Sequence, residues 1–313
     1  MSVTPAARRL FRRRLGGWRN CATVAGQRPA EQPARPPALR VLIAFLLLAS
    51  CAHMQPAFIE GPQGRLHVDD GGRGSGVPVL FVHGNSGNLT QWRAQLDHVR
   101  QSRRAAAFDL RGMGQSDLPR NGDYSVSAMV DDVEAVTSAL KLQRFVIVGH
   151  SYGGSVVAAY AARHPDRVAG VVFADSAGNV KIDPVQAKAF LDKIRSNRDA
   201  VVPQWFAPIL KPSREEVRNA VLESVRHTPG DVIANALGGL MTFDMTSLLA
   251  AYPGPVLVIA ATDIESPASL HMQFPDMPVK KMSGTGHWLM MDKPDEFNAL
   301  LDAFLASVDG RAR

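Results

Sequence analysis

Cysteine is nearly absent from this 313-residue sequence. Its two cysteines, Cys21 and Cys51, lie near the start, and residues 52–313 contain none. This larger part of the chain therefore uses no disulfide and no thiol chemistry. The sequence also lacks a clustered Cys/His ligand set and a G-x-x-x-x-G-K-[ST] loop, so we expect no metal, nucleotide or organic cofactor.

Acidic residues and lysine are scarce at the beginning of the chain, where arginine is frequent. The positive net charge is therefore unevenly distributed along the sequence. Residues 1–40 contain nine arginines, no lysine and one acid, Glu31, whereas residues 41–313 have a net charge of −2. The overall charge of +6 therefore belongs to the leader. Because no basic patch is evident in the remaining sequence, we expect no nucleic-acid partner.

A hydrophobic run long enough to span a bilayer comfortably is missing as well. The apolar run at residues 41–51 (VLIAFLLLASC) is short, follows Arg40 and closes on small residues, which is typical of a signal peptide. Residues 48–51 resemble the lipobox of bacterial lipoproteins, in which cleavage before the cysteine leaves it to carry lipid. We therefore expect residues 1–50 to be an Arg- and Pro-rich leader with a lipoprotein-type signal peptide. Lipid on Cys51 would then anchor an exported protein to the bacterial cell envelope, on the periplasmic side or at the outer membrane; an ordinary signal peptide or a short membrane anchor is the alternative.

Residues 51–313 are numerous enough for one large α/β domain. Short β-rich runs recur with helix-like segments between them, at residues 78–82, 105–108, 145–148, 170–174, 255–260 and 278–282. Alternation of this kind predicts a mostly parallel central sheet with helices on both faces. Before the first run, residues 58–72 predict an antiparallel hairpin at the edge of the sheet.

The alternation fails once, between Ala174 and Pro255, where the sequence is typical of helices and contains no convincing strand. Helices inserted between two strands of a sheet predict a lid, at about residues 177–252. Large apolar side chains in this stretch either line an acyl pocket or form the core of the lid: Trp205, Phe206, Leu210, Met241, Phe243 and Met245.

One serine is flanked by glycines between two different kinds of sequence. Residues 144–161 (RFVIVGHSYGGSVVAAYA) run from a β-rich stretch into an Ala-rich one, which predicts a strand that stops at Ser151 and a helix that begins directly after it. So sharp a turn forces its apex into a strained backbone conformation, and glycine at positions 149 and 153 removes side chains that would collide there. Ser151 is then exposed at the positive end of a helix, a favourable place for a nucleophile.

A serine hydroxyl needs a base within hydrogen-bond reach, usually a histidine held by a carboxylate. Of nine histidines, His287 is the candidate, because it lies in the loop between the last predicted strand and the last helix. For the acid we prefer Asp263, which directly follows a predicted strand at the carboxyl edge of the sheet and gives the chain order serine, aspartate, histidine. Asp175, one strand earlier, is the rival acid, and Glu265 is a more distant one.

Negative charge that develops on a substrate carbonyl oxygen needs fixed N–H donors. The backbone N–H of Tyr152, at the start of the predicted helix, is one candidate for this oxyanion hole. The loop at residues 81–88 (FVHGNSGN) supplies a second through the N–H of Asn85. We expect His83 in this loop to brace it by hydrogen bonds rather than to act as an acid or base.

Five motifs together resemble the α/β-hydrolase superfamily. They occur in order across residues 77–308: HGN at 83–85, DLRGMGQSD at 109–117, GHSYGG at 149–154, TD at 262–263 and GTGHW at 284–288. The resemblance implies the α/β-hydrolase fold and a Ser-His-Asp hydrolase with a helical lid. It also implies a largely structural role, a tight turn beside the site, for residues 109–117.

The sequence therefore predicts a serine hydrolase, carboxylesterase-like, that cleaves an ester of a small to medium, apolar substrate through an acyl-enzyme. A serine nucleophile argues against dehalogenases and epoxide hydrolases, which in this superfamily use a carboxylate. Carbon–carbon bond hydrolases, lactonases and amidases share the serine triad, and the fold is also reused for ligand-binding sensors. The sequence alone does not separate these alternatives from an esterase.

Overall fold

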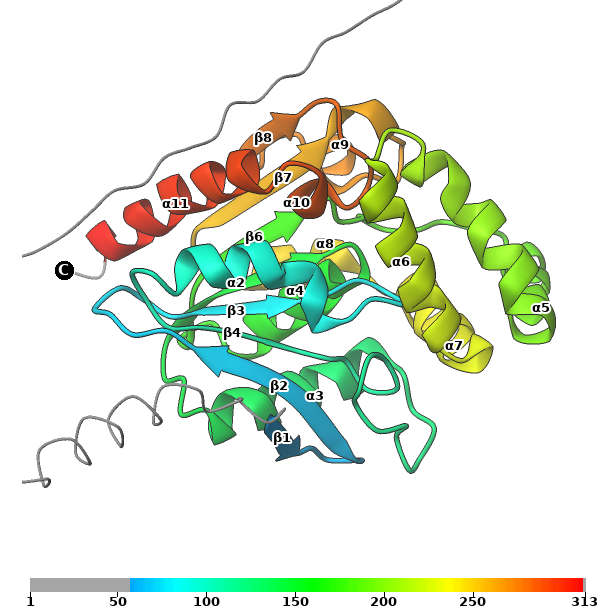
Figure 1. The fold of residues 1–313 in the computed structure, drawn as a ribbon, viewed down its shortest axis with the longest axis horizontal. Helices are drawn as coiled ribbons and strands as arrows, with labels where there is room; N and C mark the ends of the chain where they lie inside the picture. Colours follow the sequence, from blue (N-terminus) through cyan, green and yellow to red (C-terminus); the bar gives the residue numbers. More distant parts are fainter. Residues whose placement is uncertain (1–56, 312–313) are drawn as a thin grey trace, which may run out of the picture. The chain divides into compact units, whose positions relative to one another are not determined.

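Eight strands form one sheet at the centre of residues 57–311, the part of the chain that the computed structural model describes (Figure 1). The strands are β1 (Ala57–Glu60), β2 (Arg65–Gly71), β3 (Val79–Val82), β4 (Ala105–Phe108), β5 (Phe145–His150), β6 (Val168–Ala174), β7 (Val256–Ala261) and β8 (Val279–Met282). Their order in the sheet is β1-β2-β4-β3-β5-β6-β7-β8. The predicted leader and Cys51 lie outside the described residues.

The sheet is parallel from β4 to β8, whereas β1 and β2 pair antiparallel at one edge. Every residue of β3, β5 and β6 is buried, because these strands are almost entirely apolar and both of their faces are covered. The predictions of a mostly parallel sheet and of an antiparallel edge hairpin are confirmed.

Helices cover both faces of this sheet (Figure 1). They are α2 (Arg93–Val99), α3 (Val126–Ala139), α4 (Tyr152–Arg163), α5 (Pro184–Leu210), α6 (Glu215–His227), α7 (Gly230–Met241), α8 (Met245–Ala251), α9 (Leu270–Gln273), α10 (Leu289–Asp292) and α11 (Pro294–Arg311), with 3-10 turns η1 (Leu89–Trp92) and η2 (Thr262–Ile264). Successive side chains of β3 point to opposite faces. Phe81 belongs to the same core as Leu96 of α2 and Phe297 of α11. Leu80 belongs to the other core, with Met129 of α3.

Four helices, α5 to α8, lie between β6 and β7, in the stretch for which the sequence predicted an insertion; they are called the lid below. In Figure 1, α5, α6 and α7 lie beyond the carboxyl ends of β3 and β6. Helix α5 is bent at Asn197, whose φ of −152° and ψ of 60° are not helical. Within residues 57–311 no single helix is long and apolar enough to cross a membrane; α7 and α8 meet that test only as a pair, bent by 69°.

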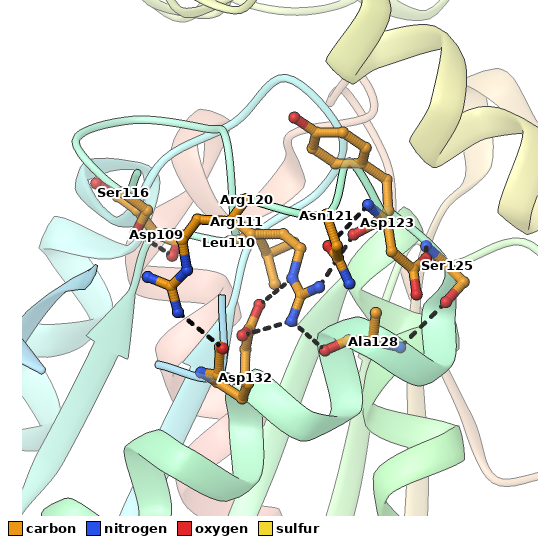
Figure 2. A network of polar contacts seen from close by, with 12 residues as sticks. Asp109, Leu110, Arg111, Ser116, Arg120, Asn121, Asp123, Ser125, Ala128 and Asp132 are labelled. Carbon is orange, nitrogen blue, oxygen red and sulfur yellow. Dashed lines mark hydrogen bonds and ion pairs between the residues drawn. The ribbon is translucent and has the colours of Figure 1, made fainter. Parts of the chain in front are cut away.

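A buried ion pair fixes the segment after β4 to helix α3. The guanidinium of Arg111 donates to both carboxylate oxygens of Asp132, at 2.6 and 2.7 Å, and to the carbonyls of Ala128 and Asp123 (Figure 2). Burial raises the pKa of Asp132, although the hydrogen bonds and charge of Arg111 oppose that shift. These four hydrogen bonds from Arg111 connect the turn at residues 109–117 to α3 and hold it beside the carboxyl edge of the sheet.

Candidate active site

Ser151 occupies a strained turn between β5 and α4. Its φ of 52° and ψ of −120° are unfavourable for a residue with a side chain. A Cβ at Gly149 would lie 2.5 Å from the carbonyl oxygen of Gly153, and a Cβ at Gly153 would lie 2.6 Å from the carbonyl oxygen of Val82. The prediction that both glycines are needed for close approach is confirmed, and the turn holds Ser151 at the carboxyl edge of the sheet.

The imidazole of His287 pairs with a carboxylate beside a cavity that Ser151 also lines. His287 follows β8, and its Nδ1 lies 2.6 Å from an oxygen of Asp175, which directly follows β6. The two side chains are only 16% and 10% exposed, and both residues line the cavity with Ser151. With the Nδ1 proton donated to Asp175, Nε2 of His287 is free to accept a proton.

The preference for Asp263 as the partner of His287 is wrong. Asp263 lies in η2 and is exposed, and its carboxylate accepts hydrogen bonds from the Gly284 N–H at 3.0 Å and the Thr262 hydroxyl at 3.1 Å. The contact with His287 is made by the rival acid, Asp175.

The reason lies in how Asp175 is held at the end of β6. Its N–H donates to the Ile259 carbonyl at 2.8 Å, and its second carboxylate oxygen accepts the Ala261 N–H at 3.0 Å. These bonds to β7 aim the remaining oxygen at His287. The more distant candidate, Glu265, is instead bound by His271 and Lys281, at 3.0 and 2.7 Å.

The two residues predicted for the oxyanion hole line the same cavity as Ser151. Tyr152 is the first residue of α4, where backbone N–H groups have no acceptor within the helix and carry partial positive charge. Asn85 lies in the loop after β3, and its side-chain amide donates to the carbonyl of Ile233 in the lid at 3.0 Å. The Asn85 side chain is thus engaged with the lid, and its backbone N–H is the group available as an oxyanion donor.

His83 braces the oxyanion loop, as predicted. Its Nδ1 donates to the Gly84 carbonyl at 2.7 Å, and its Nε2 accepts the Leu110 N–H at 2.9 Å. Burial lowers the pKa of His83, so the ring is neutral and both nitrogens are occupied.

The cavity beside Ser151 has a volume of about 320 Å³ and is mainly apolar. Lid side chains that line it are Phe190, Trp205, Phe206, Ile209, Leu237, Leu240 and Met241. Three of the six lid residues singled out in the sequence are therefore in its lining, whereas Leu210, Phe243 and Met245 pack in the protein core. Within residues 57–311 no lysine or arginine lines the cavity, and the only carboxylate in the lining is that of Asp175.

Sequence reasoning missed His150, the residue before the nucleophile. It is fully buried, and its ring centroid lies 4.7 Å from that of His287. Its Nε2 lies 2.9 Å from the His287 carbonyl oxygen, to which it donates a hydrogen bond. Burial, with a smaller effect of His287, lowers the pKa of His150 well below its ordinary value, so this second imidazole is neutral. Among residues 57–311 no group of three or more His, Cys, Asp or Glu side chains is placed to hold a metal ion.

Known proteins agree with this architecture. A family model for the alpha/beta hydrolase fold matches residues 77–221. The Caulobacter segnis protein that carries the name carbamate hydrolase RutD is 30% identical over 245 residues, which cover 72% of this chain and 90% of that protein. The chain belongs to the α/β-hydrolase fold family.

A further relative and one solved structure are also similar to this hydrolase. The 2-hydroxymuconate semialdehyde hydrolase of Pseudomonas sp. strain CF600 is 26% identical over 264 residues, covering 76% of this chain and 90% of that protein. The fold matches that of an esterase from Thermogutta terrifontis with a TM-score of 0.72 and 24% identity, over 82% of this chain and 99% of the esterase. The predicted fold class and superfamily are thereby confirmed.

Proposed function

We propose that this hydrolase cleaves esters of small to medium, apolar carboxylic acids through a covalent acyl-enzyme on Ser151. The observation that carries the proposal is the 2.6 Å contact between His287 and Asp175 beside a cavity that also contains the strained Ser151. A serine, a histidine that can accept a proton at one ring nitrogen and a carboxylate that orients this histidine are the groups that acyl transfer requires.

In this mechanism Nε2 of His287 accepts the proton of Ser151 as its oxygen attacks the ester carbonyl carbon. Asp175 orients the imidazole and stabilises the imidazolium that forms. The N–H groups of Asn85 and Tyr152 stabilise the negative charge on the former carbonyl oxygen. His287 then protonates the departing alcohol, and a water activated by the same histidine attacks the acyl group to release the acid and regenerate Ser151.

The cavity favours a neutral acyl group over an anionic one. Its lid side is lined by aromatic and aliphatic side chains, and no lysine or arginine in the part of the chain that the structure describes lines it. A substrate carboxylate buried there would lose its hydration without gaining a cationic partner. For this reason we favour an ester of an uncharged acid over a carboxylate-bearing substrate such as the one that the name 2-hydroxymuconate semialdehyde hydrolase indicates for the Pseudomonas relative.

The test is hydrolysis of a chain-length series of p-nitrophenyl esters by wild type, Ser151→Ala and Ser155→Ala. Ser155 is a matched control, because it lies one turn further along α4 and is buried. We expect Ser151→Ala to lose roughly 10⁴-fold or more in kcat and Ser155→Ala to retain wild-type kcat. A folded wild type no faster than Ser151→Ala on every ester would contradict the proposal. A higher kcat/KM on lactones, amides or carbon–carbon substrates would reject the ester but keep the serine mechanism, and tight ligand binding without turnover would indicate a sensor.

From the sequence we also propose that Cys51 carries the lipid that anchors the enzyme to the cell envelope. The test is labelling of bacteria that express the full chain with a palmitate analogue, beside Cys51→Ala and the control Cys21→Ala. We expect label on wild type and Cys21→Ala and none on Cys51→Ala. Equal labelling of all three chains, or of none, would overturn the lipid anchor without affecting the proposed chemistry.

A further inference from the structure

The loop that carries His287 is hydrogen-bonded directly to the lid. The His287 N–H donates to the carbonyl of Ile209, the residue before the last of α5, at 3.0 Å. The neighbouring Gly286 packs against the same part of the lid. A Cβ at position 286 would lie 2.6 Å from the Ile209 carbonyl oxygen and 2.1 Å from the hydroxyl oxygen of Ser213. The backbone of this loop is therefore in close contact with the end of α5 and the turn that follows it.

A buried carboxylate strengthens this contact. Asp292, the last residue of α10, is 5% exposed and has no predicted catalytic role. One of its oxygens accepts the Ser213 hydroxyl at 2.8 Å and the Gly286 N–H at 2.9 Å. The other oxygen accepts the Arg214 N–H at 2.9 Å. Two of these donors belong to the turn between α5 and α6, and the third is adjacent to His287.

The hydrogen-bond donors of Asp292 belong to two segments, so this carboxylate stabilises more than one loop. Its three hydrogen-bond donors are neutral, and none of the ion pairs in residues 57–311 includes Asp292. The carboxylate accordingly acts as a shared acceptor for two separate segments. In Asp292→Asn only one acceptor oxygen remains for three donors, so at least one N–H or O–H group loses its partner and the contact between the two segments is weakened.

We propose that Asp292 is a positioning residue, which acts on the reaction by connecting the α5–α6 turn of the lid to the His287 loop. This inference rests on the proposed function, because it assigns to His287 the role of base. Phe206 and Ile209, which line the cavity, lie on the part of α5 that ends at this turn. The lid side chains that line the cavity and the imidazole of His287 therefore keep a fixed position relative to each other. The carboxyl end of α5 stays in place during turnover.

The same arrangement predicts how Asp292 affects catalysis. A displacement of Gly286 moves the adjacent His287 relative to Ser151, and a misplacement of about 1 Å in a catalytic group costs roughly 10²-fold in rate. Substrate binding depends mainly on the apolar lining, which the loss of one hydrogen-bond acceptor leaves chemically unchanged. We therefore expect Asp292→Asn to lower kcat by roughly 10- to 100-fold and to change KM by less than about threefold.

The experiment compares kcat and KM of the full-length wild type, Asp292→Asn, Ser213→Ala and Asp309→Asn on one p-nitrophenyl ester, at a temperature at which circular dichroism shows all four folded. Asp309 is the matched control, because its carboxylate also accepts hydrogen bonds from two separate segments, from the Val77 N–H at 3.1 Å and the Arg103 guanidinium at 3.2 Å, and none of these residues lines the cavity. We expect Asp309→Asn to lower the melting temperature and retain kcat. Ser213→Ala removes only one donor, on the lid side, so we expect a fall in kcat of roughly two- to fivefold; it supplies the test if Asp292→Asn does not fold.

Hydrogen exchange of the same proteins supplies a readout independent of activity. We expect the Gly286 and His287 amides to exchange faster in Asp292→Asn while the amides of β5 and β6 remain protected. A kcat within twofold of wild type in both Asp292→Asn and Ser213→Ala, or unchanged exchange at Gly286 and His287, would overturn the positioning role. If the proposed function is wrong, the wild type hydrolyses the ester no faster than Ser151→Ala does. The hydrogen-exchange comparison still tests whether Asp292 connects the lid to the His287 loop.

Discussion

Nε2 of His150 donates a hydrogen bond to the backbone carbonyl of His287 at 2.9 Å, so the proposed catalytic base is connected to the residue that precedes the nucleophile. The N–H of His287 binds the lid and its side chain binds Asp175. Three separate parts of the chain therefore determine the position of one imidazole.

The neutral state of His150 predicts a loss of stability in mild acid. Because burial lowers its pKa, the folded protein binds fewer protons than the unfolded chain below about pH 6.5, the ordinary pKa of histidine. The stabilisation is fully present above that pH and is lost as the pH falls through and below it, with a slope of at most about 1.4 kcal/mol per pH unit for each such histidine. Urea unfolding from pH 7.5 to 5 measures this slope.

Two variants test whether His150 causes this pH dependence of the unfolding free energy. We expect His150→Gln to have a smaller decline in unfolding free energy on acidification than wild type, whereas the exposed His227, changed to Gln, leaves the decline as it is. Identical slopes in all three proteins would show that His150 does not contribute.

The two aspartates that compete for the role of acid are predicted to differ strongly. Asp175→Asn removes the acceptor that orients His287, so we expect kcat to fall by roughly 10³- to 10⁴-fold. Asp263→Asn loses only bonds to Gly284 and Thr262, and we expect less than a tenfold effect. The measurement is kcat/KM on one p-nitrophenyl ester, and the reverse order of effects would contradict the pairing of Asp175 with His287.

The sequence alone does not decide which of the two aspartates pairs with His287. The sheet, the turn at Ser151 and the loop at His287 follow from local patterns of apolar residues and glycine, so they could be predicted. Asp175 and Asp263 both follow neighbouring parallel strands, and which of them faces His287 depends on hydrogen bonds from Asp175 to β7. The contacts of His150 and Asp292 also depend on tertiary packing, because they join residues 137 and 79 positions apart and no local pattern encodes them.

The glycines of the nucleophile turn should not tolerate alanine. In Gly153→Ala the new Cβ would lie 2.6 Å from two backbone carbonyl oxygens, those of Val82 and His83, which cannot move without distorting β3. We expect a loss of at least about 3 kcal/mol in unfolding free energy or no folded protein. Gly310→Ala is the control, because a Cβ there meets nothing within 4 Å, and we expect a change of less than about 1 kcal/mol. A melting temperature of Gly153→Ala equal to that of wild type would contradict the geometry of the turn.

Among the described residues no lysine or arginine lines the cavity, which predicts that the enzyme discriminates between neutral and anionic acyl groups. Mono-p-nitrophenyl glutarate and p-nitrophenyl pentanoate have acyl chains of equal length, but only the glutarate ends in a carboxylate. We expect kcat/KM to be lower for the glutarate by at least about tenfold, because its charge would be buried unpaired. Met241→Lys, on the lid side of the cavity, should reduce the difference in kcat/KM between the pentanoate and the glutarate. A glutarate preference in the wild type would contradict the proposed neutral substrate.

Covalent labelling of the active protein with a fluorophosphonate, followed by mass spectrometry of its peptides, identifies the nucleophile directly. We expect one adduct per chain, on Ser151, with no labelling of Ser151→Ala and labelling at least about 100-fold slower in His287→Ala. An adduct on another residue, or equal labelling of wild type and Ser151→Ala, would contradict the assignment of Ser151 as the nucleophile.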